Sequence, residues 1–148
     1  MVKILLPVDG SELSLQAVRM AIALLGQGLS GSVVVANVQE PATLYEMVVA
    51  PDGAVLKRVS TAAGIDALQQ AEALLMAANV VYEREIATGD PANTIIDVAE
   101  GFACDMILMG SHGTSALREA LLGSVSHEVL HAARIPVMIV KLAEEQTD

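Results

Sequence analysis

The residues of this chain that are best suited to chemistry lie around a glycine-rich segment in its second half. Gly110 follows directly on a short apolar run, Gly113 lies three residues later, and Gly123-Ser124 stands at the start of an amphipathic segment. Glycine lets a main chain approach phosphate oxygens because it has no Cβ. The N–H groups and the dipole at a helix start favour an anion, and the hydroxyls of Ser124 and Ser126 would add donors. The segment therefore predicts an anion-binding loop that leads into a helix.

A purely structural interpretation of the same residues stays open at this point. Gly110 and Gly113 would then only shape a loop, and Ser124 would only cap a helix. The order of buried strand, two-glycine turn and Gly-Ser helix start favours a functional interpretation, because open α/β sheets bind ligands at the carboxyl ends of their strands. The segment is neither a Walker P-loop nor a Gly-x-Gly-x-x-Gly dinucleotide motif, and no Gly-x-Ser-x-Gly hydrolase elbow occurs.

A second candidate is the literal H-E-x-x-H pattern of His127, Glu128 and His131, which is typical of zinc proteases. Catalytic zinc needs a third protein ligand, and no histidine follows in the 17 residues after His131. Glu144 and Glu145 lie in an acidic tail, a poor place for a rigid ligand. We therefore interpret the two histidines as a solvated or packed pair and assign no metal ligand.

Asp9 and Cys104 are the remaining side chains with reactive chemistry. Asp9 ends the first apolar run, where its carboxylate would contact a ribose or a metal, or form an Asx turn with Gly10. Cys104 precedes an apolar run and reads as a core residue. Since Asp9 and His112 are poor candidates for a general base, we assign no catalytic residue.

Five short runs rich in Val, Ile and Leu predict the strands that position these residues, namely Val2–Val8, Ser32–Val38, Val80–Ala87, Asp105–Met109 and Val137–Val140. Four are almost continuously apolar, as buried parallel strands are, and the third is polar enough for an edge strand. Helical patterns lie between them over Ser11–Leu25, Ala54–Ala78 with a break near Gly64, Asp90–Gly101 and Ser124–Ala133. The alternation predicts an open parallel α/β sheet with helices on both faces.

Composition narrows the classes of function. The chain has 148 residues and a formal net charge of -10, with two Tyr, one Phe and no Trp. A nucleic-acid or anionic membrane partner is therefore not expected, because both need basic surfaces. One cysteine, no leader sequence and no long apolar stretch favour a cytoplasmic protein. We expect one domain over residues 1–143 and an acidic tail over 144–148.

The glycine spacing resembles the ATP-binding signature of universal stress proteins. Gly110-x-x-Gly113, nine further residues and then Gly123-Ser124 is its most specific part. The stretch Leu5–Ser11 is similar to the first strand and acidic turn of that family, and Gly89-Asp90-Pro91 and Arg134–Val137 resemble its third helix start and last strand entry. The resemblance covers nearly the whole chain.

This resemblance implies a fold, a site and partners. The fold would be a Rossmann-like sheet of the adenine nucleotide α-hydrolase type, in the strand order 3-2-1-4-5, and two chains would form a homodimer through the last strand, Val137–Val140. Asp9 would lie near the adenosine, and the main chain of Val38 would meet the adenine edge. The implied nucleotide contacts are Pro7, Val8, Asp9, Val38, Met109, Gly110, His112, Gly113, Gly123, Ser124, Val125 and Ser126.

The resemblance further implies a regulatory protein that binds ATP, ADP or AMP with Mg²⁺ and acts as a conformational switch on an unknown protein partner. An enzyme of the adenine nucleotide α-hydrolase type with slow ATP hydrolysis, and a scaffold that binds no nucleotide, stay open as alternatives. Basic residues before Gly123 are few, since Glu119 directly follows Arg118, so phosphate binding would rest mainly on main-chain donors. The long loop Glu40–Gly53, with Tyr45 and Met47, would either cover an adenine or simply connect two elements.

Overall fold

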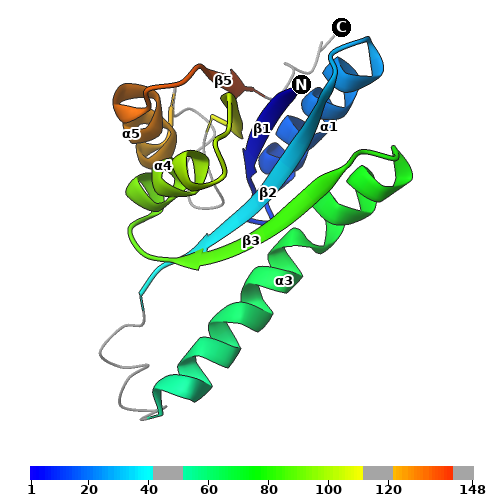
Figure 1. Ribbon diagram of the computed structural model, residues 1–148. Helices are drawn as coiled ribbons and strands as arrows, with labels where there is room; N and C mark the ends of the chain where they lie inside the picture. The colour runs from blue at the N-terminus through cyan, green and yellow to red at the C-terminus, as the bar shows by residue number, and fades with distance from the viewer. Residues whose placement is uncertain (42–51, 112–121, 142–148) are drawn as a thin grey trace, which may run out of the picture.

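Five parallel strands form the centre of the described part of the chain (Figure 1). The computed structural model describes residues 1–41, 52–111 and 122–141. The strands are β1 (Val2–Pro7), β2 (Gly31–Gln39), β3 (Tyr82–Thr88), β4 (Met106–Gly110) and β5 (Val137–Val140). They lie in the order β3-β2-β1-β4-β5, with all neighbouring pairs parallel. The open sheet and its strand order confirm the sequence-based expectation.

Helices cover both faces of this sheet. They are α1 (Glu12–Gly26), α3 (Gly53–Ala77), α4 (Pro91–Gly101) and α5 (Ser124–Ala132). Side chains cap three of them, because Ser11, Asp52 and Asp90 accept main-chain N–H groups of the first turns of α1, α3 and α4. No helix among the described residues is long and apolar enough to cross a membrane.

Alternating side chains of each strand supply two separate cores. Leu6 and Val35 pack with the residues of α1 and α3 on one face, whereas Leu5, Val34 and Ile107 pack with those of α4 and α5 on the other. All five side chains are fully or almost fully buried. The sheet is therefore covered on both sides, and its ligand-accessible parts are the ends and edges of the strands.

Two local predictions were wrong, while other element ends differ by a residue or so. The third strand begins at Tyr82, not Val80. Val81 lies just before the strand, and 70% of its surface is exposed. Helix α3 is continuous through Gly64, so the predicted break is absent. A Cβ on Gly64 would lie 2.6 Å from Cγ2 of Ile86, which shows that this glycine permits close approach of α3 to the sheet. β3 is an edge strand, as predicted.

Replacing this glycine tests its packing role. Gly64→Ala would gain about 1 kcal/mol of helix propensity, but the contact with Ile86 costs about 1–3 kcal/mol, so we expect a net loss of stability in urea denaturation. In an Ile86→Ala background the same substitution should become stabilising. Gly26→Ala is the matched control, because a Cβ on Gly26 meets nothing within 4 Å. A stabilising effect of Gly64→Ala in the unaltered background would contradict this account.

Candidate functional site at the carboxyl edge

The candidate site lies where β1 and β4 stand next to each other in the sheet. The chain leaves β1 toward β2 on one side, whereas β4 continues toward β5 on the other, and such a switch point is where open α/β sheets bind ligands. The paired residues of β1 and β4 are Ile4 with Met106 and Leu5 with Ile107. The pairing thus stops before Pro7 and Gly110, the last residues of the two strands.

The end of β1 is held by the end of β2. Val8 is buried, its N–H donates to the carbonyl of Ala36 at 2.7 Å, and its own carbonyl accepts a hydrogen bond from Nδ2 of Asn37 at 2.8 Å. Asn37 is 3% exposed. Sequence reasoning missed this residue, although an amide directly after the apolar residues 33–36 of the strand was the available signal. Asn37 fixes the start of the turn that carries Asp9.

Asp9 forms the Asx turn that was one of its two interpretations. Its Oδ1 accepts a hydrogen bond from the main-chain N–H of Ser11 at 2.9 Å, and the carboxylate is exposed at the edge of the sheet. Gly10 has a φ of +86°, a conformation that favours glycine. The contact of Asp9 with a ribose stays a prediction.

Val38 extends beyond the end of β1. The last β1–β2 pair joins Pro7 to Ala36, two residues before Val38. The carbonyl of Ala36 accepts from Val8 on the β1 side, whereas that of Gln39 accepts from Gly89 after β3. Because strand carbonyls alternate in direction, the main chain of Val38 points to the β1 side, past the last pair. Its main-chain groups are therefore well placed to meet the polar edge of a ligand.

The end of β4 is packed tightly against the first turn of α1. Met109 is buried, and a Cβ on Gly110 would lie 2.9 Å from Cγ of Leu13 and 3.2 Å from its main chain. Gly110 therefore meets a packing requirement, whatever it contacts in a ligand. The N–H of Ser111 then donates to the carbonyl of Val140 at 3.0 Å, which ties the start of the glycine segment to β5.

Two hydrogen bonds hold the start of α5 against the end of β4, and we call them the β4–α5 contact. The N–H of Gly123 donates to the carbonyl of Ser111 at 2.6 Å, and Oγ of Ser126 donates to the carbonyl of Gly110 at 2.8 Å. Ser126 is 3% exposed. Its hydroxyl proton, expected to serve a phosphate, is thus used within the protein. A direct contact of Ser126 with a nucleotide stays a prediction.

The first turn of α5 lacks the side-chain cap found on the other described helices. Gly123 is the N-cap residue and makes no side-chain hydrogen bond, in contrast to Ser11, Asp52 and Asp90. Ser124 is exposed, whereas Val125 packs on the core beneath α5. The first N–H groups of a helix need acceptors from outside it, so this end of α5 suits an anion.

Part of the expected site lies outside the described residues. His112, Gly113 and Arg118 fall within residues 112–121, and Tyr45 and Met47 fall within residues 42–51, neither of which the structure describes. The contacts of these residues with a nucleotide stay predictions. The site described above consists of the ends of β1, β2 and β4 together with the start of α5.

The histidine pair of α5 and Cys104 are the other chemical candidates. His127 and His131 are exposed on α5 with their rings stacked, the centroids 6.3 Å apart, and no group of three His, Cys, Asp or Glu side chains in the described residues could hold a metal. Cys104 is buried, as predicted, and burial raises the pKa of its thiol. Burial therefore disfavours the reactive thiolate.

The strand order and the position of these residues define an open, doubly wound, Rossmann-like protein. The chain belongs to the universal stress protein family, whose model matches residues 1–141. It is 30% identical to universal stress protein YxiE of Bacillus subtilis, over 94% of this chain and 98% of YxiE. The solved structure of hypothetical protein MJ0577, from Methanocaldococcus jannaschii, is similar with a TM-score of 0.82 and 29% identity, covering 97% of this chain and 98% of that one.

Two more distant structures share the fold and were solved with nucleotides. An Arabidopsis thaliana family member with AMP bound has a TM-score of 0.71 at 19% identity, covering 100% of this chain and 96% of that one. A universal stress protein in complex with cAMP has a TM-score of 0.65 at 24% identity, covering 94% and 95%. At these identities the likeness shows the fold alone.

The β4–α5 contact can be tested by removing one hydroxyl. Ser126→Ala should lower the free energy of unfolding by about 1–3 kcal/mol, because it leaves the buried Gly110 carbonyl without this donor. Ser124→Ala is the matched control on the same turn, and because Ser124 is exposed its effect should stay within about 0.5 kcal/mol. Urea denaturation of both variants measures the difference. Equal effects of the two substitutions would show that the buried bond does not stabilise the fold.

Proposed function

We propose that this chain is a nucleotide-binding regulatory protein that holds ATP, ADP or AMP at the carboxyl edge of its sheet. One observation carries the proposal: the first turn of α5, which has no side-chain cap, is fixed by the β4–α5 contact beside the switch point of the sheet. The AMP and cAMP complexes of other universal stress proteins support an adenine nucleotide as the ligand. Family membership alone would leave the nucleotide-free scaffold equally open.

Each part of the edge has a role in this proposal. The main chain of Val38 meets the adenine edge, beyond the last β1–β2 pair, and Pro7 and Val8 line the space beneath it. The exposed carboxylate of Asp9 accepts from a ribose hydroxyl. The remaining proposed contacts line the ribose and the phosphates, and they are Met109, Gly110, His112, Gly113, Gly123, Ser124, Val125 and Ser126.

At this edge, main-chain N–H donors take the place of the basic side chains that often bind phosphate. The structure pairs Arg19 with Glu12, Arg84 with Glu72 and Lys3 with Glu83, so these cations are engaged elsewhere. The helix end supplies oriented N–H donors and a partial positive charge instead. Mg²⁺ would neutralise the phosphates of ATP, and AMP would need the least neutralisation.

The output of the protein is conformational rather than catalytic in this proposal. Binding would change the conformation of the glycine segment, of which residues 112–121 lie outside the described part of the chain, and a protein partner would respond to that change. Neither the Asx turn of Asp9 nor the exposed His127 gives the edge a general base, so ATP hydrolysis would be slow. Multiple turnovers of phosphate release would favour the alternative, an adenine nucleotide α-hydrolase-type enzyme.

The proposed homodimer forms through β5, the edge strand opposite β3. Val137 and Ile139 are half-buried, and Met138 is 39% exposed, so the strand offers apolar side chains and one edge that pairs with no other strand among the described residues. Sedimentation of the nucleotide-free protein at twice the chain mass would support this dimer. A monomer at all concentrations would contradict it.

Calorimetric titration with ATP, ADP and AMP, with and without Mg²⁺, tests nucleotide binding. We expect saturable heat with at least one nucleotide, and Ser124→Glu should abolish it because a carboxylate then occupies the start of α5. The same carboxylate should raise helix stability by about 0.3–1 kcal/mol. A loss of binding in this variant would therefore not result from unfolding. Ser124→Gln is the uncharged control and should keep most of the affinity.

The outcomes of this titration separate the hypotheses. No heat and no shift in Tm with any nucleotide would leave the nucleotide-free scaffold as the remaining function. Binding that survives Ser124→Glu would place the phosphates away from α5. Gly113→Val should also abolish binding with the fold intact, and retained affinity there would show that the glycine segment is not the phosphate loop.

A further inference from the structure

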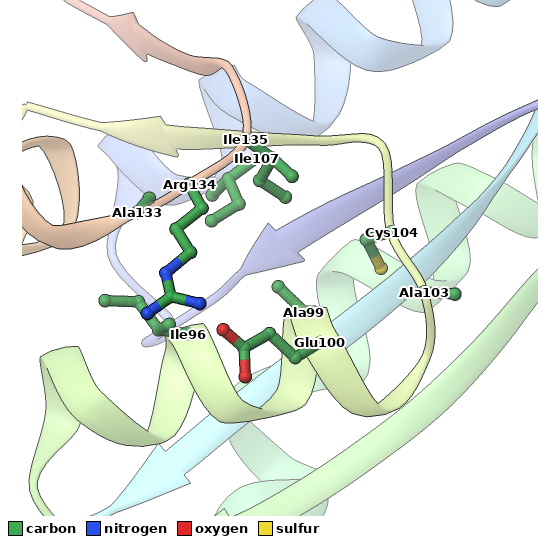
Figure 2. A pocket seen from close by; sticks show the side chains of 9 residues that line it. All are labelled: Ile96, Ala99, Glu100, Ala103, Cys104, Ile107, Ala133, Arg134 and Ile135. Carbon is green, nitrogen blue, oxygen red and sulfur yellow. The ribbon is translucent and has the colours of Figure 1, made fainter.

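A small apolar cavity lies at the opposite end of the sheet from the proposed nucleotide site (Figure 2). Its volume is about 80 Å³, and Ile96 and Ala99 of α4, Cys104, Ile107 of β4 and Ile135 form much of its wall. Ile107 is the second residue of β4, and Ile135 precedes β5. The cavity is therefore beside the amino ends of these strands and separate from the carboxyl edge described above.

Two opposite charges flank this cavity. Glu100 is on α4, and Arg134 is in the connection between α5 and β5. In Figure 2 the guanidinium group of Arg134 and the carboxylate of Glu100 point toward the same side of the cavity, near Ile96. Neither side chain forms an ion pair with any residue in the part of the chain that the structure describes. Both are exposed, so a ligand can reach them from solvent.

We propose that this cavity binds a free aliphatic amino acid such as leucine or valine. The carboxylate of the ligand pairs with the guanidinium of Arg134, its ammonium pairs with the carboxylate of Glu100, and its aliphatic side chain enters the apolar cavity. The cavity volume fits the aliphatic side chain. An apolar cavity of about 150 Å³ accepts benzene, so a cavity of about 80 Å³ holds three or four carbon atoms. Arginine suits the carboxylate because its planar fork can donate two parallel hydrogen bonds.

The charges favour a zwitterion over other small ligands. A simple carboxylic acid would pair with Arg134 but would place its charge near Glu100, and the chain as a whole carries a charge of -10. A simple amine would leave Arg134 without a partner. A zwitterion satisfies both groups and has no net charge, so the acidic surface does not repel it. Since both charges are exposed, the ion pairs are weak individually, and the expected affinity is modest.

Methyl NMR spectra of the full chain, labelled at isoleucine, test this proposal. Addition of L-leucine to about 10 mM, well above a Kd of about 1 mM, should shift the methyl signals of Ile96, Ile107 and Ile135 saturably. Ile22 of α1 and Ile65 of α3 are internal controls and should not move. Two further probes, 4-methylpentanoate and 3-methylbutylamine, keep the aliphatic group but lack the ammonium and the carboxylate, respectively.

Variants at the two charges complete the test. Arg134→Gln and Glu100→Gln should each weaken leucine binding roughly twofold to fivefold, which is the loss expected for one exposed ion pair. Arg58→Gln, an exposed substitution on α3, is the matched control and should leave binding unchanged. Absence of saturable shifts at the three cavity isoleucines would overturn the proposal. Equal binding of leucine and of both truncated probes would also overturn it, since the cavity would then recognise only apolar groups.

Discussion

The buried hydrogen bond from Ser126 to the carbonyl of Gly110 is the interaction on which the carboxyl edge depends. It joins the first turn of α5 to the last residue of β4, and the N–H of Gly123 reinforces it on the neighbouring carbonyl of Ser111. These bonds determine where the helix start lies relative to β1 and β4. The donors that the edge presents to a ligand are thus positioned by the protein interior and not by the ligand.

The same edge shows how an acidic chain can suit an anion. Three of the four described helices satisfy their first turns with Ser11, Asp52 or Asp90, but the N-cap residue of α5 is Gly123, which has no side chain to do so. A helix end of this kind attracts negative charge locally, although the net charge of the chain is -10. The charge thus argues against extended polyanions and leaves a single small nucleotide compatible with the fold.

The strands, helices and strand order could be predicted because apolar periodicity, capping residues and the family resemblance all pointed to the same sheet. Contacts between distant segments could not. The sequence suggested Ser126 as a phosphate donor, but its bond to Gly110 depends on how α5 packs against β4. Gly64 looked like a helix break because glycine is a poor helix former. The contact that requires a glycine there is with Ile86 of β3, which is distant in the sequence. The cavity near Arg134 likewise requires α4 and β4 to meet in space.

A crystal structure of the full chain grown with ATP and Mg²⁺ tests the central claim most directly, that main-chain donors at the start of α5 hold a nucleotide at the switch point. The account predicts phosphate oxygens at about 2.7–3.2 Å from the N–H groups of Ser124 to Ser126, and the adenine edge against the main chain of Val38. A nucleotide bound elsewhere, or phosphates held only by side chains away from α5, would contradict it.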